Sequence, residues 1–176
     1  MMKDINEIVS ALLDGTLQES ETIEFKRTLP HDLPNIAKTI VGIANSGGGY
    51  LILGAIEQPR DGRMIVGVDN ATAIQRRLTQ ILSEYTIGVI GTPYLYTIES
   101  KIVVVYRIEK AESIAYYSRR QTSPARLIAY TRSAIGSRIK EVAEEKKYYA
   151  TVYKYMTIEA FLISLYTKTW RFFEPS

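Results

Sequence analysis

The sequence predicts a domain that mixes helices with strands, and two stretches carry most of this prediction. In the first, residues 34–54, apolar residues recur at helical spacing before three glycines, Gly47 to Gly49, and a continuous apolar run, Tyr50 to Leu53, follows them. In the second, residues 94–108, two apolar segments flank a two-residue turn. The first stretch indicates a helix that leads into a buried strand, and the second indicates an antiparallel pair.

The other elements follow from the same periodicities. Helical spacing predicts helices over residues 6–17, 34–44, 73–84 and 140–167. Alternation and apolar runs predict strands over residues 22–26, 50–57, 64–68, 94–98, 101–108 and 127–132, with 50–57 and 64–68 forming a hairpin. The polar stretch 109–126 predicts a long loop. On strand 22–26, Glu24 and Lys26 occupy the face opposite Ile23 and Phe25, so a carboxylate and an ammonium share a side.

The three glycines allow two interpretations. A phosphate-binding P-loop has the order strand, glycines, helix and carries a lysine, whereas here the order is reversed and that lysine is absent. We therefore favour a helix cap with close backbone packing. Direct contact of Gly47 to Gly49 with a phosphate is the alternative.

The composition restricts the possible chemistry. The 176 residues provide for one domain and a small appendage, and 46% of them are hydrophobic, as in globular proteins. No apolar run is long enough to cross a membrane and no signal peptide is evident, so we expect a cytoplasmic protein without a membrane partner. With no cysteine and one histidine, any clustered metal ligands are carboxylates, which favour a hard cation. The net charge of +3 permits a nucleic-acid partner without requiring one.

Three motifs occur in order along the chain: Glu19-Ser20-x-x-x-Glu24-Phe25-Lys26, then Ile43 to Gly54, then Ile65-Val66-Gly67-Val68. This set resembles the AlbA_2 domain, a nucleic-acid-binding domain that Schlafen proteins share with many prokaryotic regulators. Leu127 to Arg132 is similar to the closing strand of the family with its arginine. The resemblance implies an α+β domain with a mixed, mostly antiparallel sheet and flanking helices over residues 1–138, followed by a helical extension over 139–176.

The resemblance also implies a site. In nuclease-active Schlafen-like proteins, three acidic residues form a metal-dependent RNA-cleaving centre, and the matching positions here are Glu19, Glu24 and Glu57. These residues would be the catalytic ligands of Mg²⁺ or Mn²⁺, with Lys26 neutralising charge on the phosphate. Glu57 is one methylene longer than the aspartate that is common there. The alternative is structural: Glu19 is solvated, and Glu24 pairs with Lys26 or an arginine.

Basic residues after the antiparallel pair form a candidate nucleic-acid surface, and these are Arg119, Arg120, Arg126, Arg132, Arg138 and Lys140. The alternative is solvated loop charge. Lysines and tyrosines also interleave over residues 146–155, as in base-stacking surfaces. Because the tyrosines keep helical spacing, we favour a packing helix and predict a homodimer that uses it.

Two functions from different classes follow. The first is a metal-dependent endoribonuclease that acts on structured RNA such as tRNA. The second is a non-catalytic DNA- or RNA-binding regulatory module in which the same residues are structural. ATP binding, which an older label of the family suggests, is a weaker alternative because no Walker lysine or dinucleotide fingerprint is present.

Overall fold

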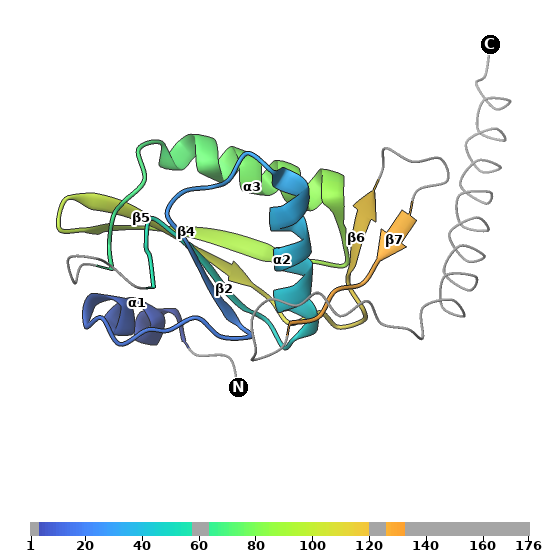
Figure 1. Ribbon diagram of the computed structural model, residues 1–176, viewed down its shortest axis with the longest axis horizontal. Coiled ribbons are helices and arrows are strands. Elements are labelled where there is room, and N and C mark those ends of the chain that lie inside the picture. Colours follow the sequence, from blue (N-terminus) through green and yellow to red (C-terminus); the bar gives the residue numbers. More distant parts are fainter. Residues whose placement is uncertain (1–3, 58–63, 120–125, 133–176) are drawn as a thin grey trace, which may run out of the picture. The chain divides into compact units, whose positions relative to one another are not determined.

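A computed structural model describes residues 4–57, 64–119 and 126–132 (Figure 1). These residues all belong to one compact unit, Met1–Glu141. The predicted C-terminal helix lies outside the described residues, as does the predicted domain boundary at residue 138.

The described residues form three helices and two sheets. The helices are α1 (Ile5–Leu13), α2 (Leu33–Asn45) and α3 (Ala71–Tyr85). The strands are β1 (Ile23–Lys26), β2 (Gly49–Leu53), β3 (Thr86–Ile87), β4 (Gly91–Ile98), β5 (Lys101–Ile108), β6 (Tyr116–Arg119) and β7 (Arg126–Ile128). The larger sheet has the order β1-β2-β5-β4, with only the β1–β2 pair parallel, and β3-β6-β7 form an antiparallel sheet. The α+β class with a mixed, mostly antiparallel sheet is therefore confirmed.

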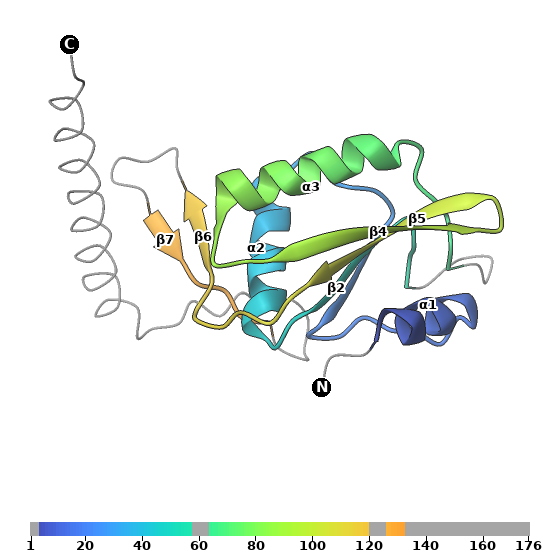
Figure 2. The same ribbon diagram turned by 180° about the vertical axis from the view of Figure 1, so that it is seen from behind.

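The larger sheet carries a hydrophobic core on each face, because side chains alternate along its strands. On the central strand β2, Leu51 and Leu53 pack with α2 and α3, whereas Tyr50 and Ile52 pack with α1. Figures 1 and 2 show α2 and α3 on one side of this sheet and α1 on the other. All five residues of β2 are buried, as expected for a strand covered on both faces.

The three glycines act as a helix cap and as a point of close backbone approach. After α2 ends, the N–H of Gly48 donates to the carbonyl of Ile43 at 3.0 Å. A Cβ atom on Gly48 would lie 2.6 Å from the backbone nitrogen of Lys110, and one on Gly49 would lie 1.9 Å from the carbonyl oxygen of Thr22. The structural interpretation of this motif is confirmed.

The structure differs from the predicted elements in several places. The helix predicted over residues 6–17 ends at Leu13, the strand predicted over 127–132 ends at Ile128, and β3 was not predicted. Residues 64–68 do not form a strand, although one bridge, Ala55 to Ile65, and backbone hydrogen bonds join this segment to the residues that follow β2. Gly67 has φ of +80°, and the next N–H donates to Ile102, so the chain turns toward β5 instead of continuing a hairpin. The predicted loop 109–126 contains β6, whose four residues are too few for a periodicity to reveal.

Tyr106 on β5 provides a test of the core. Its side chain is 1% exposed, and its hydroxyl has no hydrogen-bond partner among the described residues. Burial raises the pKa of this hydroxyl well above its usual range. We expect Tyr106→Phe to raise the free energy of unfolding by about 1 kcal/mol, because it removes an unpaired buried polar group. Urea denaturation measures this change, and a loss of stability would show that the hydroxyl has a partner.

Candidate functional site

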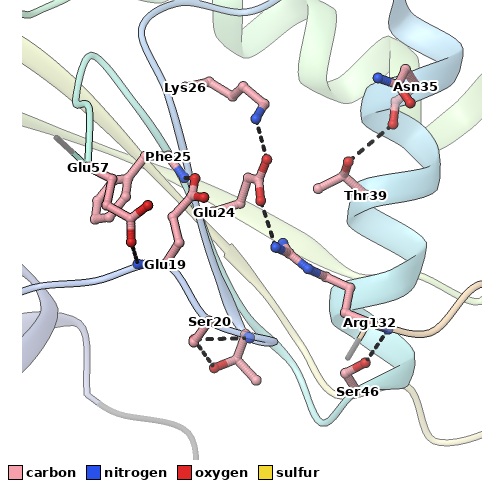
Figure 3. A network of polar contacts seen from close by, with 11 residues as sticks. Glu19, Ser20, Glu24, Phe25, Lys26, Asn35, Thr39, Ser46, Glu57 and Arg132 are labelled. Atoms are coloured by element: carbon pink, nitrogen blue, oxygen red, sulfur yellow. Dashed lines mark hydrogen bonds and ion pairs between the residues drawn. The ribbon is translucent and has the colours of Figure 1, made fainter. Parts of the chain in front are cut away.

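A pocket with a volume of about 130 Å³ lies where β1, α2 and the segment after β7 meet. Glu24 and Lys26 line it from β1, the polar face of α2 lines it from Asn35 to Gly42, and residues 130–132 complete it. Figure 3 shows Glu24 at the centre, between Lys26 and Arg132.

Local periodicity directs these side chains into the pocket. Ile23 and Phe25 pack with α1, so Glu24 and Lys26 project from the other face of β1, toward α2. On α2 the pocket residues Asn35, Lys38, Thr39 and Gly42 follow the spacing i, i+3, i+4 and i+7 of one helix face. The opposite face of α2 packs on the sheet.

Glu24 joins two cations in the pocket. Its Oε2 atom accepts a hydrogen bond from Nη2 of Arg132 at 2.7 Å, and its Oε1 atom pairs with Nζ of Lys26. The side chains of Glu24 and Arg132 are 7% and 8% exposed, whereas that of Lys26 is 34% exposed. The Glu24–Arg132 pair is therefore a buried ion pair, and Lys26 extends it toward solvent.

The Asn-Ser pair at the end of α2 holds the segment that carries Arg132. Ser46 Oγ accepts the backbone N–H of Arg132 at 2.9 Å. The Asn45 amide bonds both the N–H and the carbonyl of Ala115, at 2.8 and 2.9 Å, and also the carbonyl of Tyr130, at 2.9 Å. A Cβ atom on Gly42 would lie 3.0 Å from Cγ of Arg132, so this glycine leaves room for the arginine to cross α2. These residues position Arg132.

Lys38 is a functional candidate that the sequence analysis did not identify. Its ammonium lies over the rings of Tyr117 and Tyr130, at 5.6 and 6.0 Å from their centroids. The two rings are themselves 6.0 Å apart and are nearly fully buried. Such cation–π contacts hold the ammonium at the pocket. The sequence did hold a signal for Lys38. The apolar residues of α2 define its buried face, so Asn35, Lys38 and Gly42 lie together on the other face.

The pocket is positively charged. Among the described residues, three cations line it, from Lys26, Lys38 and Arg132, and Glu24 is the one carboxylate. Nε and Nη1 of Arg132 are buried and have no hydrogen-bond partner in the part of the chain that the structure describes. The local charge therefore favours an anionic ligand.

The three predicted metal ligands have internal partners. Glu19 Oε1 accepts the N–H of Phe25 at 2.8 Å, and Glu57 Oε1 accepts the N–H of Glu19 at 2.9 Å (Figure 3). Glu24 is turned away from this pair, toward Arg132. Over residues 4–57, 64–119 and 126–132, no three acidic, histidine or cysteine side chains form a group suited to a metal. The carboxylates as arranged here do not fit a metal ion.

The predicted basic surface is described only in part. Arg119 and Arg126 are register partners in the backbone pairing of β6 with β7. Arg132 is in the pocket, with its side chain buried. Arg120, Arg138 and Lys140 lie outside the described residues, and so does the segment 146–155. No helix within the described ranges is long and apolar enough to cross a membrane.

The fold and the pocket define an α+β domain with a basic, carboxylate-containing pocket beside a mixed sheet. The chain belongs to the Schlafen, AlbA_2 family, whose model matches residues 19–139, more than half of the sequence. The resemblance seen in the sequence motifs is thereby confirmed. No curated protein matches the chain.

Two solved structures are similar to this one. The DIP2311 protein from Corynebacterium diphtheriae is 18% identical, with a TM-score of 0.46, and the match covers 70% of this chain and 26% of that one. The chain therefore spans about a quarter of that protein. The N-terminal domain of a protein from Nitrosomonas europaea, described as related to the ATP-dependent DNA helicase RecG, is 22% identical, with a TM-score of 0.47. That match covers 75% of this chain and 86% of the domain.

Proposed function

We propose that this domain binds nucleic acid, and that its pocket contacts phosphate. The observation that carries the proposal is the convergence of Lys26, Lys38 and Arg132 on a pocket whose described residues include one carboxylate, Glu24. Arg and Lys side chains supply most of the affinity for nucleic acid by neutralising phosphates and releasing counterions. Membership of the Schlafen, AlbA_2 family supports the same function.

The proposal predicts salt-dependent binding that involves the pocket lysines. In fluorescence anisotropy titrations with single-stranded RNA, we expect log Kd to change linearly with log salt. Replacing both Lys26 and Lys38 by methionine should reduce the slope by about 0.7, because the two lysines line one pocket and each phosphate contact on a single strand contributes about 0.7. Lys110→Met is the matched control, because Lys110 is exposed and is not a pocket residue. Absence of binding to RNA and DNA even at low salt would contradict the proposal.

The second candidate is the metal-dependent endoribonuclease, acting on structured RNA such as tRNA. The hydrogen bond from the backbone N–H of Glu19 to Glu57 Oε1 supports it, because it holds two of the three matched residues next to each other near β1. For Mg²⁺ or Mn²⁺ to bind the trio, Glu24 would have to leave Arg132.

Incubation of total tRNA with the protein tests this candidate, with Mn²⁺, Mg²⁺ or EDTA present. Discrete fragments that require metal and disappear in Glu57→Gln would support the nuclease. Glu57 is the appropriate position for this variant because it takes no part in the buried ion pair. Intact tRNA under every condition would contradict the nuclease. If binding were still salt-dependent, the protein would be a non-catalytic nucleic-acid-binding module.

The homodimer is also a proposal, and it rests on the apolar and aromatic spacing of residues 140–167. Two domains in a dimer would present two basic pockets to one nucleic acid and so raise the affinity by multivalency. Light scattering that shows a monomer at high protein concentration would contradict it.

A further inference from the structure

We propose that the pocket between β1 and α2 binds a phosphate monoester, the terminal phosphate of a nucleic-acid strand. That the phosphate belongs to a nucleic-acid strand rests on the proposed function. The choice of a monoester instead of an internal phosphodiester rests on the charge, size and burial of the pocket itself.

The charge of the pocket matches a dianion. Lys26, Lys38 and Arg132 carry three positive charges, and Glu24 compensates one of them. An internal phosphodiester carries one negative charge, whereas a phosphate monoester carries about −1.5 to −2 at pH 7. A terminal phosphate therefore neutralises the excess charge more completely than a backbone phosphate does.

The buried guanidinium of Arg132 adds a second, independent indication. More than nine-tenths of this side chain is buried, yet Nε and Nη1 have no acceptor among the described residues. A buried cation normally has its charge and its N–H groups compensated, because desolvation is costly. Glu24 is shared with Lys26, so it compensates Arg132 only in part. An anion in the pocket supplies the missing negative charge.

The size of the pocket favours a phosphate group over a whole nucleotide. Its volume of about 130 Å³ is well below the roughly 300 Å³ at which small-molecule pockets begin. The nearby aromatic rings do not form a base-stacking platform, since Tyr117 and Tyr130 are 5% and 7% exposed. They instead hold the ammonium of Lys38 in place. The pocket thus recognises the charge of a strand end and leaves the base outside.

The test compares strands that differ only in their ends. Anisotropy titrations use one labelled RNA sequence with a 5′-phosphate, with a 3′-phosphate, or with hydroxyls at both ends. We expect a strand with a terminal phosphate to bind about tenfold more tightly than the hydroxyl strand, as for a charge-assisted contact. Lys38→Met should reduce this ratio to within about twofold, because it removes one of three pocket cations. Lys110→Met should leave the ratio unchanged.

The outcomes separate the two proposals. Equal binding of phosphate and hydroxyl ends, with salt dependence intact, would overturn the monoester inference and leave the proposed function standing. Calorimetric titrations with AMP and with adenosine test the converse case, in which the pocket binds a phosphate monoester but the protein binds no nucleic acid. If AMP bound in a Lys38-dependent way, adenosine did not, and no strand bound, then nucleic-acid binding would be overturned and the pocket would be a monoester site for a small molecule.

Discussion

Replacing Glu24 by alanine is expected to lower the free energy of unfolding by about 3–5 kcal/mol, the cost of leaving a buried charge without its partner. The side chains of Glu24 and Arg132 are 7% and 8% exposed, and Nη2 of Arg132 donates to Glu24 at 2.7 Å. In the variant, Arg132 loses the one hydrogen-bond acceptor that its side chain has among the described residues.

Urea denaturation with a matched surface variant measures this effect. Glu109 also pairs with an arginine, Arg107, but the two side chains are 40% and 33% exposed. Glu109→Ala should therefore cost less than about 1 kcal/mol. The double variant Glu24→Ala, Arg132→Met should recover much of the lost stability, because it removes the orphaned charge together with its partner. A Glu24→Ala variant as stable as Glu109→Ala would show that the ion pair is not important for the fold.

This result matters for any test of catalysis. A Glu24→Ala protein that no longer cleaves or binds RNA would have lost both a carboxylate and a large part of its stability. Activity measurements on this position therefore need the folded fraction of each variant, from circular dichroism at the assay temperature. Glu57→Gln avoids the difficulty, since within the described ranges Glu57 bonds only the backbone N–H of an exposed residue, Glu19.

Gly49→Ala is expected to lower the free energy of unfolding by more than about 4 kcal/mol, among the largest effects of single substitutions. Its Cβ atom would lie 1.9 Å from the carbonyl oxygen of Thr22. This carbonyl accepts the N–H of Tyr50 at 2.7 Å, at the start of the parallel pairing of β1 with β2. Because the obstructing atom is backbone, relief of the overlap requires the two strands to separate, and β1 carries Glu24 and Lys26.

Gly47→Ala is the control within the same motif. No atom of the described residues lies within 4 Å of a Cβ atom at this position, although its φ is +109°. The substitution should cost only the backbone strain, about 1–3 kcal/mol. It should also leave binding of a strand with a terminal phosphate unchanged, since Gly47 does not line the pocket. Loss of phosphate binding in a folded Gly47→Ala protein would favour direct contact between the glycines and a phosphate.

The sequence by itself determined the local elements and the faces of their side chains. The helical spacing before Gly47 predicted α2, and the apolar run after Gly49 predicted β2. The two apolar segments around the turn at Glu99 and Ser100 predicted the β4–β5 pair. Alternation on β1 predicted that Glu24 and Lys26 share a face. These features depend on periods of a few residues, so they are visible without knowledge of the fold. The family motifs added the fold class, which the structure confirms.

Only the tertiary structure decided which residues the polar faces of these helices and strands contact. Arg132 lies 108 residues from Glu24 in the sequence, and Tyr130 lies 85 residues from Asn45, yet hydrogen bonds join each pair. The sequence analysis left open whether Glu24 is a metal ligand or the partner of an arginine. In the structure its carboxylate pairs with Arg132 and Lys26. A residue pattern tells which side of an element is polar, but the partner depends on how distant segments pack, and packing across 108 residues has no local signal.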